Sequence, residues 1–390
     1  MKITNITAYC LSYPYKDFIA DGLSCVSGRS SVLVRVDTDT ELYGIGEAVT
    51  FGGSPKAIQT IIQQQLAPLL MGEDPLQIEY LFQKMQWNNW GCGRYGLIKG
   101  GISGIDIALW DLLGKAANLP VARLLGQHKD RVKSYASGGF YAPGKTLDDL
   151  KAEMERYLKM GYHAFKIKVG RTMDISQNPL QYARGNDLRY SYDFDLQRIS
   201  AVREAIGPTG TLMIDMNCTW SVEQVLCAAP FFDSQNIYWI EEPIRSDDLR
   251  GYVRIRQFLP KVRVAGIENE QGLSKLEQYL QAGALDVVQM NLGWCGGFTQ
   301  GSRIAALAMA HHKSIAPHTF FSAILHAANI HFAAANPHTL YIESEENENP
   351  FRTVLLKEPL EHDADMCFFV PQKPGLGVAV NWDVVERYSV

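Results

Sequence analysis

From residue 131 onward, eight strand-like segments alternate with segments that have the apolar spacing of helices. Alternation of this kind favours a parallel sheet, and eight repeats favour a closed barrel. We therefore expect an α/β fold in which the carboxyl ends of all eight strands meet on one face. The expected strands are Val132 to Ser137, His163 to Val169, Leu212 to Asn217, Ile237 to Glu242, Val262 to Glu268, Val287 to Asn291, Ile315 to His318 and Leu340 to Glu343.

The N-terminal part of the chain has a different pattern, which predicts an α+β unit. Strand-like segments fill residues 1–49, and helical segments follow from Asp74 to about Trp87 and from Gly100 to Leu119. The stretch from Tyr13 to Arg29 is rich in Ser, Gly and aromatic residues. We expect it to be an open loop that covers a pocket.

The 390 residues exceed the size of one ordinary domain, so we expect two. Residues from about 360 predict a strand and a loop that return to the N-terminal unit. We therefore expect a capping domain at 1–128, completed by the tail 360–390, and a barrel domain at 129–359.

Composition excludes several classes of function. The net charge of −5 provides no basic surface for nucleic acid, and no apolar run reaches the roughly 20 residues of a membrane helix. Seven cysteines occur without a CxxC motif, and the first residues are too polar for a signal peptide. We expect a cytoplasmic protein that acts on a small molecule.

Three of the expected strands end in an acid: Asp215, Glu241 and Glu268. Because carboxylates repel one another, three at one rim of a barrel imply a cation between them. Ligands that are all oxygen favour Mg²⁺, with Mn²⁺ as a second choice. The nearby Glu242 and Glu270 are alternative or supporting ligands that the pattern does not separate from the other three.

Lys166 and Lys168 lie two residues apart, so they share one face of a strand. If that face is the barrel interior, repulsion and burial lower a lysine pKa, and a neutral amine can act as a base near pH 7. The alternative is a pair of lysines at the solvent-exposed rim.

His318 ends the seventh expected strand, and the sixth, next to it, ends in Gln289-Met290-Asn291. This histidine is either an acid/base or a buried polar residue with its bonds satisfied. Residues 171–193 form a long polar insertion after the second strand, and it includes Tyr182, Arg184, Arg189, Tyr190 and Tyr192. Such an insertion is expected to touch either the substrate or a second subunit.

Together these residues resemble the mandelate racemase group of the enolase superfamily over nearly the whole chain. That resemblance implies a modified TIM barrel, (β/α)₇β, beneath an N-terminal α+β capping domain. The motifs that carry it are Gly104-Ile105-Asp106-Ile107-Ala108-Leu109-Trp110-Asp111 with Gly114-Lys115, Lys166-x-Lys168, Asp215-x-Asn217, Glu241-Glu242-Pro243, Gly266-Ile267-Glu268, Gly296-Gly297, Asn349-Pro350-Phe351-Arg352 and Pro374-Gly375-Leu376-Gly377.

The resemblance also implies roles for single residues. It makes Asp215, Glu241 and Glu268 the Mg²⁺ ligands. It makes Lys168 the base, with Lys166 lowering its pKa. His318 becomes the acid/base on the other side of the substrate, and Glu343 the carboxylate of the last strand. We expect Asn217, Lys166 and Glu343 to contact the substrate.

The chain departs from the group at Asn291, where an aspartate normally pairs with the histidine. The amide oxygen of Asn291 can accept the imidazole N–H, but it cannot stabilise imidazolium. His318 should therefore be a weak base, which makes racemisation or epimerisation less favoured. A flipped amide would favour the other tautomer of the ring.

The favoured reaction is Mg²⁺-dependent removal of the α-proton of a sugar acid to give an enediolate. Loss of a β-hydroxyl group would then dehydrate an aldonate or aldarate to a 2-keto-3-deoxy acid. Departure of a ring oxygen from a lactone or anhydro acid would instead make the protein a cycloisomerase. Two other classes remain: a Schiff-base aldolase that uses Lys168, and an acid-sugar binder with impaired turnover. Relatives usually form homo-oligomers.

Overall fold

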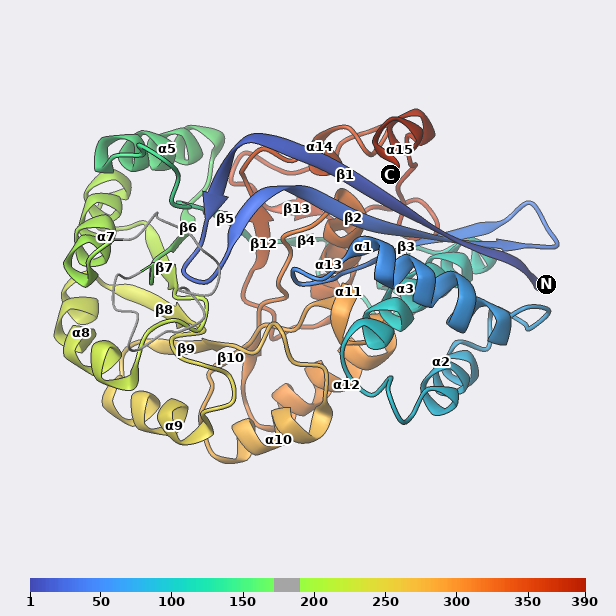
Figure 1. The fold of residues 1–390 in the computed structure, drawn as a ribbon, viewed down its shortest axis with the longest axis horizontal. Helices are drawn as coiled ribbons and strands as arrows, with labels where there is room; N and C mark the ends of the chain where they lie inside the picture. Colours follow the sequence, from blue (N-terminus) through green and yellow to red (C-terminus); the bar gives the residue numbers. More distant parts are fainter. Residues whose placement is uncertain (172–189) are drawn as a thin grey trace.

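The structure is a computed structural model that describes residues 1–171 and 190–390. Its centre is an eight-stranded parallel sheet in the order β11-β10-β9-β8-β7-β6-β5-β12, and a bridge between Ile315 and Thr339 joins the two ends (Figure 1). The predicted barrel is confirmed. Its strands are β5 (Ser134–Gly138), β6 (Ala164–Lys168), β7 (Thr211–Asp215), β8 (Ile237–Glu241), β9 (Arg263–Gly266), β10 (Val287–Val288), β11 (Ser314–Ile315) and β12 (Ile342–Glu345).

Helices lie between the strands and cover the outside of the barrel, which gives the (β/α)₇β arrangement (Figure 1). Polar residues fix where several of them begin. Thr146 accepts a bond from the N–H of Asp149, which bonds back in a capping box, and Ser221 does the same with Gln224. The helices are α5 (Leu147–Met160), α7 (Tyr192–Ile206), α8 (Val222–Ser234), α9 (Leu249–Phe258), α10 (Leu273–Gln281), α11 (Leu292–Cys295), α12 (Gly297–Ala310), α13 (Ala323–Ala335) and α14 (Pro350–Thr353).

The N-terminal unit is a three-stranded antiparallel sheet with helices packed on it, as the sequence predicts. Gly44 and Gly46 let α3 approach the sheet, because a Cβ at either position would lie about 2 Å from a helix carbonyl oxygen, that of Ala108 or Gly104. The elements are β1 (Ile3–Ala20), β2 (Cys25–Thr38), β3 (Tyr43–Ala48), α1 (Pro55–Thr60), a π-helix (Ile61–Leu66), a 3₁₀ helix (Ala67–Leu69), α2 (Ile78–Asn88), α3 (Leu97–Ala117) and α4 (Val121–Leu124).

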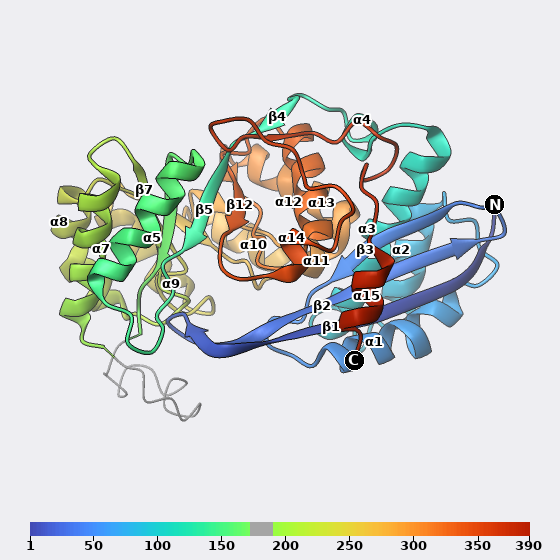
Figure 2. The same cartoon turned by 90° about the horizontal axis from the view of Figure 1, so that it is seen from above.

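The expected loop from Tyr13 to Arg29 is wrong, because this stretch is a β-hairpin. β1 and β2 pair from Ile3 to Ala20, and their register shifts between Pro14 and Ile19. Tyr, Phe, Ile and Val in this stretch favour strands, and the prediction gave more weight to its Ser and Gly residues. The hairpin reaches from the capping sheet across the barrel (Figures 1 and 2).

The tail returns to the N-terminal unit, but it contains a helix that the sequence did not predict. β13 (Phe368–Phe369) pairs with β4 (Arg131–Val132), and α15 (Trp382–Tyr388) then packs beside β1 (Figure 2). In the described part of the chain, no helix has the length and apolar character needed to cross a membrane.

His331 of α13 connects three parts of the fold. Its Nδ1 accepts a bond from the N–H of Ala122 at 3.1 Å, and its Nε2 donates to the carbonyl oxygen of Leu376 at 3.0 Å. The bond accepted at Nδ1 requires a neutral ring with its proton on Nε2. Burial lowers the pKa of His331 to about 4, although the bond to Leu376 acts in the opposite direction.

Because His331 must be neutral to make these contacts, we expect the free energy of unfolding to decrease in acid. An unfolded histidine has a pKa of about 6.5, so between pH 6.5 and 4 the unfolded state binds a proton that the folded state does not. His331 therefore contributes fully above pH 6.5, and about 3 kcal/mol is lost as the pH falls to 4. Denaturant unfolding across this range should show a smaller slope with pH in His331→Gln. An equal slope in both proteins would contradict the assignment.

Candidate active site

Two of the predicted metal ligands end neighbouring strands, and the third lies just past the next. Asp215 is the last residue of β7 and stands opposite Glu241, the last residue of β8. Glu268 lies two residues beyond β9. All three carboxylates are buried, and Oε2 of Glu268 makes no hydrogen bond. The parallel register therefore gathers the three acids at one end of the barrel.

Both lysines of β6 point into this cluster, so the alternative of a solvent-exposed pair is wrong. Lys168 stands opposite Asp215 in the register, and its Nζ donates to the Asp215 carboxylate. Lys166 Nζ lies 2.6 Å from an oxygen of Glu241 and 3.0 Å from one of Glu343. Each ammonium group is buried against carboxylates.

The electrostatics of the two lysines differ from the expectation. Burial lowers the pKa of Lys168, but Asp215 and the other carboxylates outweigh it and raise the pKa above its usual value. The pKa of Lys166 rises for the same reason, with Glu241 and Glu343 as the main carboxylates. The predicted lowering of the lysine pKa considered only the repulsion between the two lysines and their burial, and it left out the surrounding carboxylates. A divalent cation on the same carboxylates would act in the opposite direction.

The carboxylates respond to the same charges. Burial raises the pKa of Glu241 to about 7 against the effect of Lys166, and burial beside the other acids raises the pKa of Glu268 well above its usual value. The pKa of Asp215 is lowered, because Lys168 and Lys166 outweigh its burial. The cluster therefore contains more carboxylates than its two lysines can keep ionised.

His318 and Asn291 meet as expected, but with the amide turned the other way. Oδ1 of Asn291 accepts the N–H of Gly293 at 2.9 Å, so its Nδ2 is the atom 2.8 Å from His318 Nδ1. Because Nδ2 can only donate, Nδ1 must accept, and the ring proton lies on Nε2. Nε2 faces Glu268 at 3.3 Å and Glu343 at 3.7 Å. Burial lowers the pKa of His318 to about 4.

Glu343 and Asn217 complete the predicted set. Glu343 accepts the N–H of Thr319 at 2.8 Å and lies between Lys166 and His318. Asn217 belongs to a turn rather than to the strand, with a φ of 46°, and its N–H donates to Asp215. Its buried Oδ1 has no hydrogen-bond partner.

Sequence reasoning missed the side chains that surround these groups. Phe51 stacks on the His318 ring with centroids 5.5 Å apart, and Phe140 stacks on Phe320 at 5.6 Å. Lys168 Nζ lies 5.3 Å from the centre of the Phe140 ring. Gln289 donates to Glu241 at 2.7 Å. Phe51 belongs to the loop after β3, so the capping unit contributes directly to the pocket wall.

The donor set fits a hard divalent cation, although it is not preassembled. In residues 1–171 and 190–390, no three His, Cys, Asp or Glu side chains stand ready to hold a metal ion. Lys168 and Lys166 bond oxygens of Asp215 and Glu241 instead. The unbonded oxygens of Glu268 and Asn217 point to a missing positive partner, and oxygen is the ligand that Mg²⁺ prefers.

The insertion falls largely outside the described residues. Tyr182, Arg184 and Arg189, which were expected to touch the substrate or a neighbouring subunit, lie in 172–189. At its borders, Arg171 Nη1 donates to the carbonyl oxygen of Asp21 at 2.6 Å, and Tyr190 stacks on Tyr141 at 5.2 Å. Tyr192 packs on Trp220 in the barrel.

Comparison with known proteins identifies the family of the chain. Residues 14–126 match the N-terminal domain model of mandelate racemase / muconate lactonizing enzyme, and residues 149–384 match the enolase C-terminal domain-like model. The chain belongs to the mandelate racemase / muconate lactonizing enzyme family. It is therefore an enzyme of the enolase superfamily, and its named relatives are lyases and isomerases.

Two curated family members match this chain over most of its length. An arabinonate dehydratase of Saccharolobus solfataricus is 32% identical over 92% of the chain and 90% of its own length. A D-galactarolactone cycloisomerase of Agrobacterium fabrum is 32% identical over 100% of the chain and 99% of its own length. A crystal structure of a racemase from Streptomyces coelicolor with bound magnesium has a TM-score of 0.87, 29% identity and full coverage of both chains. Magnesium therefore occurs within the family.

Proposed function

We propose that this enzyme removes the α-proton of a sugar acid and dehydrates the acid to a 2-keto-3-deoxy acid. The observation that supports the proposal best is the buried cluster formed by Lys168, His318 and the three strand-end carboxylates. A Schiff-base aldolase does not need those carboxylates. Named relatives include both dehydratases and cycloisomerases of sugar acids.

Asp215, Glu241 and Glu268 would hold Mg²⁺, or Mn²⁺. When bound there, the cation supplies positive charge that stabilises a doubly negative carboxylate intermediate and favours a neutral Lys168. A cation on the carboxylates would compete with Lys166 for their oxygens. The Lys166 ammonium group and the Asn217 amide oxygen would then be free to bind the substrate.

The first chemical step belongs to Lys168. Its neutral amine takes the proton from the α-carbon, the C–H bond breaks, and the electron pair enters the carboxylate to form an enediolate. The amine becomes an ammonium group beside Asp215, which is the state favoured by its neighbours in the structure. The Lys166 ammonium group would bind the carboxylate end of the substrate, and Glu343, 3.0 Å from Lys166 Nζ, would hold that ammonium group in place.

The second step belongs to His318. The enediolate electron pair forms the new C=C bond as the β C–O bond breaks, and the departing hydroxyl group takes the Nε2 proton of the protonated ring. The resulting enol becomes the 2-keto acid. Because Nδ1 faces the Asn291 amide nitrogen, imidazolium is rare, but its low pKa of about 4 makes it a strong acid.

Racemisation is disfavoured by the same contact. A second base would have to accept a proton at Nε2, and Asn291 keeps a proton on that atom. Cycloisomerisation remains a second candidate, because the cycloisomerase of Agrobacterium fabrum matches the whole chain. The steps are the same, with a ring oxygen leaving in place of a hydroxyl group.

Deuterium exchange tests the proposal. Sugar acids, lactones and anhydro acids are incubated with the enzyme and Mg²⁺ in deuterated water, and α-deuterium and products are measured. The variant His318→Asn should retain exchange but slow elimination by a factor on the order of 10²–10⁴, the usual contribution of a general acid. Absence of exchange and product throughout the library would refute the function. Loss of exchange in His318→Asn would instead make His318 the base.

A further inference from the structure

The tip of the β1–β2 hairpin is a tight turn around an acidic residue. The N–H of Asp21 donates to the carbonyl oxygen of Ser24 at 3.1 Å, and Oδ1 of Asp21 accepts the N–H groups of Leu23 and Ser24. In the described part of the chain, no residue bonds the other carboxylate oxygen. The side chain is partly exposed. One oxygen thus fixes the turn, and the other remains available.

This turn is held over the ends of three barrel strands. The end of β1 exchanges two backbone bonds with the segment after β5, between Ala20 and Tyr141, at 2.7 and 2.8 Å. A Cβ on Gly22 would lie 2.6 Å from the carbonyl oxygen of Met216 and 2.9 Å from that of Val169. Val169 directly follows Lys168, and Met216 directly follows Asp215. The hairpin tip therefore lies against the residues next to the base and to a metal ligand.

The Asp21 carboxylate interacts electrostatically with Lys168 and Asp215 in the candidate active site. Burial raises the pKa of the Asp21 carboxyl, the Lys168 ammonium is the largest opposing influence, and Asp215 raises it further. Asp17, on the same strand, is exposed instead. Arg29, the arginine of the hairpin nearer its tip, forms an ion pair with Glu345 at 2.5 Å.

We propose that Asp21 binds a hydroxyl group of the sugar chain and makes the enzyme select acids with a single carboxylate. This inference rests on the proposed function and narrows its substrate to aldonates or their anhydro or lactone forms. A carboxylate binds a hydroxyl group through a strong charge-assisted bond. It repels a second carboxylate, and such repulsion is an effective way to exclude a related ligand.

The cations of the pocket support the same selection. Lys166 and Lys168 serve the reacting end of the substrate, and Arg171 donates to the carbonyl oxygens of Asp21 and Ser24. Each of these three cations already bonds a carboxylate or backbone carbonyl oxygens, so a diacid would bring its second negative charge toward the Asp21 carboxylate. A monoacid brings only hydroxyl groups.

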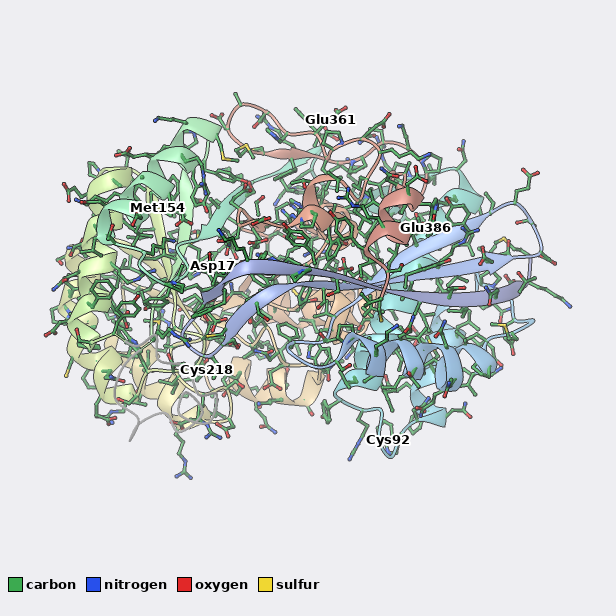
Figure 3. All side chains as sticks on the ribbon, turned by 45° about the horizontal axis from the view of Figure 1, so that its top comes forward. Asp17, Cys92, Met154, Cys218, Glu361 and Glu386 are labelled. Atoms are coloured by element: carbon green, nitrogen blue, oxygen red, sulfur yellow. The ribbon has the colours of Figure 1, made fainter. Side chains whose placement is uncertain are left out.

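The test compares matched pairs of an aldonate and the aldarate of the same configuration. Both kcat/KM and the calorimetric dissociation constant are measured with Mg²⁺ for the wild type and Asp21→Asn, which keeps the shape but removes the charge. Asp17→Asn is the matched control, because Asp17 lies on the same strand but is exposed on an outer groove beside Tyr15 and Lys145 (Figure 3).

We expect the wild type to favour the aldonate by at least about tenfold, or 1.4 kcal/mol. The preference should shrink by about tenfold or reverse in Asp21→Asn and persist in Asp17→Asn. An unchanged preference in a folded Asp21→Asn protein, or a wild-type preference for the aldarate, would overturn the proposal. The proposed function and the proposed role of Asp21 can fail separately. Absence of exchange with every acid would refute the function. The binding preference between aldonate and aldarate would still test the role of Asp21.

Discussion

The variant Lys168→Ala should lose α-proton exchange by a factor on the order of 10³ or more, because it removes the only group proposed to take that proton. Exchange is measured as α-deuterium uptake with Mg²⁺ and a substrate of the wild type. The loss should appear in kcat rather than only in KM, since the amine acts on the bound acid. Thermal unfolding establishes that the variant is folded.

Lys115→Ala is a matched control for this variant. Lys115 also donates to an aspartate, Asp111, at 2.6 Å, but it belongs to α3 in the capping unit. It should change stability without abolishing exchange. If Lys168→Ala kept exchange near the wild-type rate while His318→Asn lost it, the assignment of base and acid would have to be reversed.

Removal of divalent cations should abolish both exchange and elimination, and Mg²⁺ should restore both. A lysine is too weak a base for a carbon acid unless the developing charge is stabilised. Mg²⁺ should also raise the melting temperature of the wild type, since a ligand that binds only the folded state stabilises it. Both activity after EDTA treatment and the shift in melting temperature with Mg²⁺ are measured.

The ligand assignment is tested by Glu268→Gln, which keeps the shape of the side chain and removes its charge. We expect weaker Mg²⁺ binding and a smaller shift in melting temperature. Glu270→Gln is the control, because Glu270 lies two residues further along and bonds Lys275 instead of facing the pocket. Equal effects of the two variants, or full activity without divalent cations, would refute the metal site.

The positions of Asp215, Glu241 and Lys168 could be predicted because strand register is simple. Each residue ends a strand of a parallel sheet, and parallel strands align their carboxyl ends on one face. The side-chain period of two also placed Lys166 beside Lys168. For these residues, the local sequence determines which face of the strand each side chain lies on and how far along the barrel it lies.

Other features depend on contacts between distant segments. The direction of the Asn291 amide is decided by the N–H of Gly293, and sequence alone leaves both orientations open. The charge state of Lys168 depends on how many carboxylates surround it. Phe51 reaches His318 from the capping unit, and no periodic pattern marks such a contact. The hairpin was missed because its Ser and Gly residues suggested a loop.

The packing of the tail on β1 affects the order in which the molecule can be completed. β1 is synthesised before the barrel, whereas α15 emerges only after the whole barrel. The N–H of Val390 donates to the carbonyl oxygen of Cys10 at 3.0 Å, and Leu11 forms a bridge with Ser389. During synthesis on the ribosome, β1 at the edge of the capping sheet therefore remains uncovered until the barrel has been made. The two units are completed together rather than in sequence, so neither is expected to be an independent building block for fusion or truncation.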